Sequence, residues 1–301
     1  MTTRSQNYFF ILPAALSVLA IIAIFTWGLK PGIDLIGGSL LQVSYSNERP
    51  DAETVRTLVS ELDYGQILVQ PTGEKDYLLR QRALSLEEKN ALVGTLGEKG
   101  EVHEVQFNSI GPSIGAELVK KAWTAIVLVT LSIIAFIAFA FRKVSKPIPS
   151  WKYGIVAIIT LLHDILIPLG LFAYLGYARG AELDALFIVA LLTILCISIN
   201  DTIVVFDRIR ENLRRNEESN RHESFKEVVS RSISQTIVRS INTSVTVIIV
   251  LFALFYLGPA ATQDFALTLI VGMIAGTYSS IFLASPLLVV WDNWSRKRKA
   301  A

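Results

Sequence analysis

The sequence predicts an α-helical membrane protein with six transmembrane helices and one small domain outside the membrane. Its 301 residues are 52% hydrophobic and 18% charged, with a mean hydropathy of +0.48, which is too apolar for a water-soluble chain of this length. Between the first two apolar stretches, residues 30–117 are of mixed polarity and must fold outside the bilayer. Stretches of about 20 apolar residues, the length that crosses a bilayer, predict spans at 8–29, 120–141, 153–177, 184–206, 239–257 and 264–291.

The orientation follows from the basic residues. The first span is interpreted as an anchor, because a cleaved signal has a shorter apolar core and a small-residue cleavage site. Cytosolic loops are rich in Lys and Arg, so both termini are expected in the cytosol and residues 30–117 outside. The basic residues are Arg142, Lys143, Lys146 and Lys152, the segment 208–231, and "RKRK" at 296–299.

These assignments divide the chain into five parts. We expect a cytosolic N-terminus with helix 1 (1–29), an extracytoplasmic domain (30–117), helices 2–4 (118–206), a cytosolic loop with an amphipathic helix (207–238), and helices 5–6 with a basic cytosolic tail (239–301). The amphipathic helix begins with the capping box Ser224/Glu227.

The extracytoplasmic part carries six signals in the order β-α-β-β-α-β. In the first strand Leu41, Val43 and Tyr45 alternate with polar residues, as in a half-buried strand. Ser85 and Glu88 form a capping box at the second helix. The order is that of a ferredoxin-like split βαβ unit. Strands are predicted at 39–46, 66–70, 76–82 and 101–108, and helices at 51–63 and 85–96.

Two Gly-rich stretches flank this domain, "PGIDLIGGS" and "SIGPSIGAE". Neither has the spacing of a phosphate-binding loop, so both are interpreted as rigid junctions that link the domain to the membrane helices. Glycine permits backbone angles that other residues resist, and proline fixes φ. Asp34 is either functional or a helix cap. The junction residues are Asp34, Gly37, Gly38, Gly111, Pro112 and Gly115.

Three predicted spans carry polar side chains, which are costly in lipid. Those of span five follow a helical i, i+3, i+4, i+7 pattern and share one face. Arg239 begins this span on the cytosolic side, so we expect it to pair with Asp201 and to lower the burial cost of both. The polar groups are Arg239, Asn242, Thr243 and Thr246 in span five, Thr160, His163 and Asp164 in span three, and Asn200 and Asp201 in span four.

The alternative is that these groups only hydrogen-bond neighbouring helices together. It fits Thr160, Thr243 and Thr246, and it stays open for His163 with Asp164. An ionisable residue at the depth of Asp201 is by default a functional candidate.

Other features predict packing rather than chemistry. Gly272, Gly276 and Ser280 lie four residues apart in span six and let another helix approach closely, either in this bundle or in another subunit. Cys196, the one cysteine, is expected to pack, and His103 has no second ligand nearby. No metal site is therefore expected.

Taken together, the motifs resemble the SecF family, the smaller subunits of the SecDF protein-export complex. The resemblance covers nearly the whole chain, and its most specific element is "NDTIVVFDRIREN". The motifs, in the family's order, are "GIDLIGGS", "SIGPSIG", "LLHDILI", "SINDTIVVFDRIREN", "RSINTSVTVIIVLF" and the small-residue span six.

The resemblance implies a function. SecF belongs to the resistance-nodulation-division (RND) superfamily, in which two pseudo-symmetric six-span halves form a proton-driven machine, and the other half would be SecD. By position, Asp201 would carry the proton and Arg239 would be its partner. The complex assists SecYEG and SecA in moving preproteins across the cytoplasmic (inner) membrane. Protons are then the coupling ion, with no other cofactor, membrane lipid around the chain and no nucleic acid.

Two other functions compete. Asp164 and Asp201 on adjacent spans superficially resemble the dyad of an intramembrane aspartyl protease, but that dyad needs two carboxyls in one site, and the protease signature G-x-G-D is absent. We therefore expect no enzyme. A purely structural subunit that stabilises SecD remains the alternative, and Asp201→Asn separates it from a proton pathway.

Overall fold

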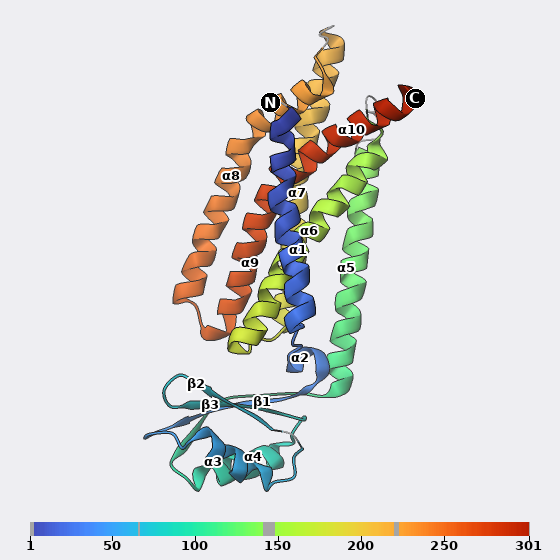
Figure 1. The fold of residues 1–301 in the computed structure, drawn as a ribbon. Helices are drawn as coiled ribbons and strands as arrows, with labels where there is room; N and C mark the ends of the chain where they lie inside the picture. The colour runs from blue at the N-terminus through green and yellow to red at the C-terminus, as the bar shows by residue number, and fades with distance from the viewer. Residues whose placement is uncertain (1–2, 66, 141–147, 220–222, 301) are drawn as a thin grey trace. The chain divides into compact units, whose positions relative to one another are not determined.

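The computed structural model describes residues 3–65, 67–140, 148–219 and 223–300 (Figure 1). Within these ranges six helices are long and apolar enough to cross a bilayer, which confirms the predicted number. Arg142, Lys143 and Lys146, which support part of the predicted orientation, lie outside the described residues. The candidate spans are Phe10–Trp27, Pro112–Phe139, Ser150–Arg179, Ala185–Glu218, Phe225–Leu257 and Thr262–Arg298.

The helices are longer than the predicted spans. α5 begins at Pro112, inside the stretch assigned to the outer domain, because proline is well suited to a first helical turn. α7 and α8 fill most of the predicted loop 207–238, so the amphipathic segment and span five form one helix, with the expected capping box at Ser224 and Glu227. The helices are α1 (Thr3–Trp27), α5 (Pro112–Ala140), α6 (Ser150–Arg179), α7 (Ala185–Glu218) and α8 (Phe225–Leu257).

The sixth span contains a π-bulge. α9 (Ala260–Ser279) continues through the π-helical turn η1 (Ser280–Ala284) into α10 (Ser285–Ala300). Pro286 follows directly. A proline has no N–H to donate and its ring clashes with the carbonyl four residues earlier, and a π-turn is one way in which a helix absorbs such an interruption.

The described residues form two compact units: a helical bundle (1–30, 124–182 and 186–301) and a sheet domain (31–123 and 183–185). In the bundle, buried apolar side chains of α6, α7, α8 and α10 form one core. At its centre the rings of Tyr153 and Phe206 meet edge to face with centroids 5.2 Å apart, a favourable arrangement for aromatic pairs.

The sheet domain has the predicted β-α-β-β-α-β order and an antiparallel sheet with strand order β2-β3-β1-β4. α3 and α4 cover one face of the sheet (Figure 1), and Leu41, Val43 and Tyr45 are buried as predicted. β2 starts two residues later than predicted and includes Pro71. The elements are β1 (Gly38–Tyr45), α3 (Ala52–Ser60), β2 (Leu68–Thr72), β3 (Asp76–Gln81), α4 (Leu86–Gly97) and β4 (Val102–Ile110).

Candidate functional site

Asp201 lies on the buried face of α7. Ser198, Thr202 and Val205 follow the same helical stripe and are also buried, so the spacing turns the carboxylate inward. Asp201 is 5% exposed, whereas its neighbour Asn200 is exposed on the other side of the helix. Among the described residues the Asp201 carboxylate has no hydrogen-bond or ion-pair partner. It is therefore a buried titratable group without direct compensation.

The expected direct pair between Asp201 and Arg239 does not form. Arg239 is exposed on α8, and it acts on Asp201 only through longer-range electrostatic attraction. Its long side chain lines a polar cavity of about 130 Å³ between α7 and α8, which also contains Asp207 and Glu211. Long cationic side chains extend toward polar surroundings where they can, and these two carboxylates supply them. The cavity also reaches Val204, less than one helical turn from Asp201.

No described residue covers the polar face of α8. Asn242, Thr243 and Thr246 are exposed, as is Arg239. The two threonine hydroxyls donate only to backbone carbonyls of their own helix. An arginine and an asparagine facing hydrocarbon are costly, so this face needs a partner or water.

A second polar cluster lies inside the bundle between α6 and α7. His163 Nδ1 is 2.9 Å from Asp164 Oδ1, and the Ser198 hydroxyl donates a short hydrogen bond to Asp164 Oδ2. All three residues are buried. Thr160 is buried as well, but its hydroxyl donates to the Val156 carbonyl of its own helix, as the packing alternative expects. Each oxygen of the Asp164 carboxylate thus already has a partner, and among the described residues Asp164 shares no hydrogen-bond partner with Asp201.

The small residues of α9 pack against their own bundle. A Cβ on Gly272 would lie 2.2 Å from Ile194 Cδ1, and one on Gly276 would lie 3.0 Å from Ser198 Cβ. Both neighbours are on α7, and Ser280 is fully buried. Gly272 and Gly276 therefore let α9 approach α7 of the same chain, rather than a helix of another subunit.

The two Gly-rich junctions meet inside the sheet domain. A Cβ on Gly115 would lie 2.8 Å from the backbone N of Gly37, and one on Gly37 would lie 2.6 Å from Pro112 Cα. Gly37 and Gly38 also have φ values of 80° and 140°, where side chains are disfavoured. Gly111, just before Pro112, completes this contact region.

Asp34 acts as a helix cap. It lies in the four-residue helix α2 (Ile33–Ile36), which was not predicted, and its Oδ2 accepts a hydrogen bond of 3.0 Å from the Ala185 N–H, the first of α7. The Gly32 N–H donates to the Leu183 carbonyl beside it. The first N–H groups of a helix lack intrahelical partners, so this carboxylate satisfies one of them.

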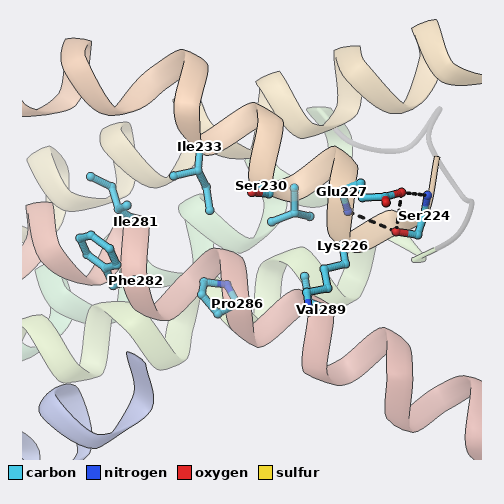
Figure 2. A pocket seen from close by; sticks show the side chains of 10 residues that line it. Ser224, Lys226, Glu227, Ser230, Ile233, Ile281, Phe282, Pro286 and Val289 are labelled. Atoms are coloured by element: carbon cyan, nitrogen blue, oxygen red, sulfur yellow. Dashed lines mark hydrogen bonds between the residues drawn. The ribbon is translucent and has the colours of Figure 1, made fainter. Parts of the chain in front are cut away.

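A cavity of about 300 Å³ lies elsewhere in the bundle (Figure 2). The first turns of α8 and the region around η1 line it with mostly apolar side chains, and the Ser224/Glu227 capping box lies at one end. Neither Asp201 nor Asp164 contributes to it. Cys196 does not pack as expected but is exposed, and His103 is a surface residue bonded to Ser46.

Sequence patterns missed the residues that act across helices. Ser198 was not singled out, although it is one turn before Asp201 and faces Asp164. Asn212 was missed too; its amide donates 2.8 Å hydrogen bonds to Ser232 and Gln235 and ties α7 to α8. A polar residue on the buried stripe of an otherwise apolar helix is the signal that could have found both.

Comparison with known proteins gives one consistent result. A family model described as "Protein export membrane protein SecD/SecF, C-terminal" matches residues 91–294, and "SecD/SecF GG Motif" matches residues 22–48. The "Protein translocase subunit SecF" of Thermobaculum terrenum is 43% identical over 96% of this chain and 93% of its own length. That of Synechocystis sp. is 35% identical over 92% of this chain and 90% of its own length.

A solved structure is also similar. The crystal structure of SecDF from Thermus thermophilus, described as a translocon-associated membrane protein, aligns with a TM-score of 0.79 at 32% identity. The alignment covers 96% of this chain and 38% of the SecDF chain. The present chain therefore spans well under half the length of that relative.

Proposed function

Because this chain belongs to the SecF family of protein translocase subunits, we propose that it is one half of a SecDF complex that uses the proton gradient to assist preprotein movement across the cytoplasmic membrane. Asp201 takes up and releases the proton, and SecD supplies the other half of the pathway. SecYEG and SecA are the machinery assisted. Protons are the coupling ion, and the chain catalyses no covalent chemistry of its own.

The observation that carries the proposal is the setting of Asp201. The carboxylate is 5% exposed and has no direct partner among the described residues, so each change in its protonation changes the free energy of the bundle. The polar cavity between α7 and α8 begins within one helical turn of it and provides a route from the side where Asp207 lies. Moving one charge through 100 mV releases about 2.3 kcal/mol, which biases two helix arrangements by several tens-fold.

The exposed face of α8 supports the SecD partner. Arg239, Asn242, Thr243 and Thr246 lie on this face without cover from the part of the chain that the structure describes, and lipid is a poor environment for them. We propose that SecD helices cover this face, so that the proton pathway lies between the two subunits. In this arrangement both termini are cytosolic, the sheet domain is extracytoplasmic, and the Gly-rich junctions pass its motion to the helices.

The test replaces Asp201 in cells that lack the native subunit. Asp201→Asn keeps the shape but removes the titratable group, so gradient-dependent export of a secreted reporter should be lost while SecD still co-purifies. Asp201→Glu should retain some export. Glu217→Gln is the matched control, because it removes an exposed carboxylate from the same helix, outside the cavity, and should leave export unchanged. Full export with Asp201→Asn would refute the proton role and leave a structural subunit that stabilises SecD.

Arg239 allows a second arm in the same assay. Arg239→Lys keeps the positive charge without the planar guanidinium, and Arg239→Ala removes the charge that attracts the Asp201 carboxylate. Export should therefore fall further with Ala than with Lys. Equal loss with both substitutions would mean that the geometry of the guanidinium, rather than its charge, is what matters.

A further inference from the structure

His163 has a buried ring nitrogen that no described residue satisfies. The residue is 4% exposed in the middle of α6, and its Nε2 atom lies out of solvent without a hydrogen-bond partner among the described residues. A buried acceptor or donor that lacks a hydrogen-bond partner destabilises the folded state. Such atoms are uncommon enough in folded proteins that each needs an explanation.

The charge of the neighbouring carboxylate decides the role of this nitrogen. With Asp164 ionised, its oxygens can only accept hydrogen bonds, so the 2.9 Å contact between Asp164 Oδ1 and His163 Nδ1 requires a hydrogen on Nδ1. The Ser198 hydroxyl supplies the other donor, to Oδ2. In the neutral imidazole the remaining nitrogen, Nε2, then carries a lone pair, and among the polar side-chain atoms of the three residues it is the buried one without any hydrogen-bond partner in the described part of the chain.

We propose that His163 and Asp164 form a proton-binding site within the bundle, with His163 Nε2 as the proton acceptor and Ser198 as the residue that holds the Asp164 carboxylate in position. On uptake, a hydronium ion transfers its proton to Nε2: an O–H bond breaks, an N–H bond forms, water is released and the imidazole becomes an imidazolium. Asp164 stays a carboxylate, so the net charge of the pair changes from −1 to zero. A buried pair with no net charge is less costly than a buried net charge.

Ser198 connects this site to the packing of the neighbouring helices. It bonds Asp164 on α6 from α7, and its Cβ and Oγ are the atoms nearest to the position of a Cβ on Gly276 of α9. Three helices, α6, α7 and α9, therefore meet at Ser198, next to the proposed site. The inference concerns proton binding alone and holds whether or not the complex couples protons to export.

The elements packed against α6 differ in the titratable groups that they carry. The described side chains of α1 (10–27) and the turn η1 contain no titratable group. Three helices packed against α6 carry titratable groups. On α7 these are Cys196, Asp201, Asp207 and the charged residues of the C-terminal turns. On α9 they are Tyr278 and Asp264, which pairs with Arg179, and on α10 they are Lys297, Arg298 and Asp292, which pairs with Arg296.

The test observes the ring nitrogens by solid-state NMR of the full chain, co-purified with SecD, labelled with ¹⁵N-histidine and reconstituted in lipid. His103→Gln and His222→Gln leave His163 as the one histidine of this chain, and subtraction of the His163→Gln spectrum removes signals of SecD. At alkaline pH we expect a protonated Nδ1 and a bare Nε2. On acidification the bare-nitrogen signal should be replaced by a second protonated one.

Two variants complete the design. Asp164→Asn should populate both tautomers at alkaline pH and lose the doubly protonated form over the range in which the complex stays assembled. Thr160→Val is the matched control, because this buried hydroxyl bonds only its own helix and should change neither result. If the complex with Asp164→Asn does not assemble, the pH titration of the unmodified complex is by itself the test of the proposal. A bare Nδ1 at alkaline pH, or an Nε2 that stays bare in acid because SecD donates to it, overturns the proposal.

Discussion

Replacing Gly115 with alanine is expected to loosen the contact between the two Gly-rich junctions. Gly115 is helical, so alanine by itself should stabilise the helix by about 1 kcal/mol. Its new Cβ, however, would lie 2.8 Å from the Gly37 N and 3.0 Å from the Leu35 carbonyl oxygen. These are backbone atoms that cannot rotate away, and such overpacking typically costs about 1–3 kcal/mol.

Gly94 provides the matched control. It is also helical, in α4 of the same domain, and nothing lies within 4 Å of its added Cβ. Gly94→Ala should therefore keep the full gain of about 1 kcal/mol. The two variants should differ by about 1–3 kcal/mol, which is roughly a 5- to 150-fold difference in an opening equilibrium.

The assay is hydrogen exchange of the intact chain with its partner, followed by mass spectrometry of peptides from residues 31–48 and 108–118. Exchange in these peptides should be faster with Gly115→Ala than in the unmodified chain, and it should be unchanged or slower with Gly94→Ala. Exchange that is equally slow in both variants would refute the argument that the junction depends on a missing side chain.

Three further predictions follow from the same structure. With Cys196 replaced by serine, an impermeant thiol reagent added outside should label Glu74→Cys but not Glu218→Cys; labelling of both from one side would contradict six spans. The Arg82 guanidinium and, to a smaller extent, the Ser85 N–H lower the pKa of Glu88 from 4.5 to about 2. The ionised carboxylate therefore stabilises the sheet domain above about pH 4.5, and this contribution is lost as the pH falls toward 2. Thermal unfolding of the unmodified chain should show this loss of stability, and unfolding of Glu88→Gln should not. Gly272→Ala should destabilise the bundle by about 1–3 kcal/mol, and Ile194→Ala should reduce that cost, whereas additive losses of stability would argue against direct packing.

Features encoded within one helix or strand could be predicted from the sequence. The capping boxes at Ser85/Glu88 and Ser224/Glu227 are present with both reciprocal hydrogen bonds, because all their atoms lie within one helical turn. Strand alternation and span length are equally local, and for this reason the number of spans and the order of the sheet domain were correct. The helix ends were less well placed, since polar residues after Phe206 continue α7 through its buried stripe.

Contacts between helices could not be predicted in the same way. The predicted pair of Asp201 and Arg239 was wrong because their separation depends on the rotation of α7 against α8, and Arg239 lines the cavity that contains Asp207 and Glu211 instead. The bonds of Asp34 to Ala185 and of Ser198 to Asp164 join residues 151 and 34 positions apart. No pattern within a single helix indicates which of several polar residues on the next helix it will meet.

The missed contacts share one helix, and this explains why the acid that remains unpaired is Asp201. Asp34 caps the first N–H of α7, Ser198 bonds Asp164 in its middle, and Asn212 bonds Ser232 and Gln235 toward its end. Within the bundle, the bonds of Ser198 and Asn212 give α7 a defined rotation, and the stripe that carries Ser198 inward also carries Asp201 inward. The packing of α7 thus holds the Asp201 carboxylate in a buried position, although no ion pair offsets the free-energy cost of its burial. Loss of the Ser198 bond should therefore let α7 turn and expose Asp201 to water.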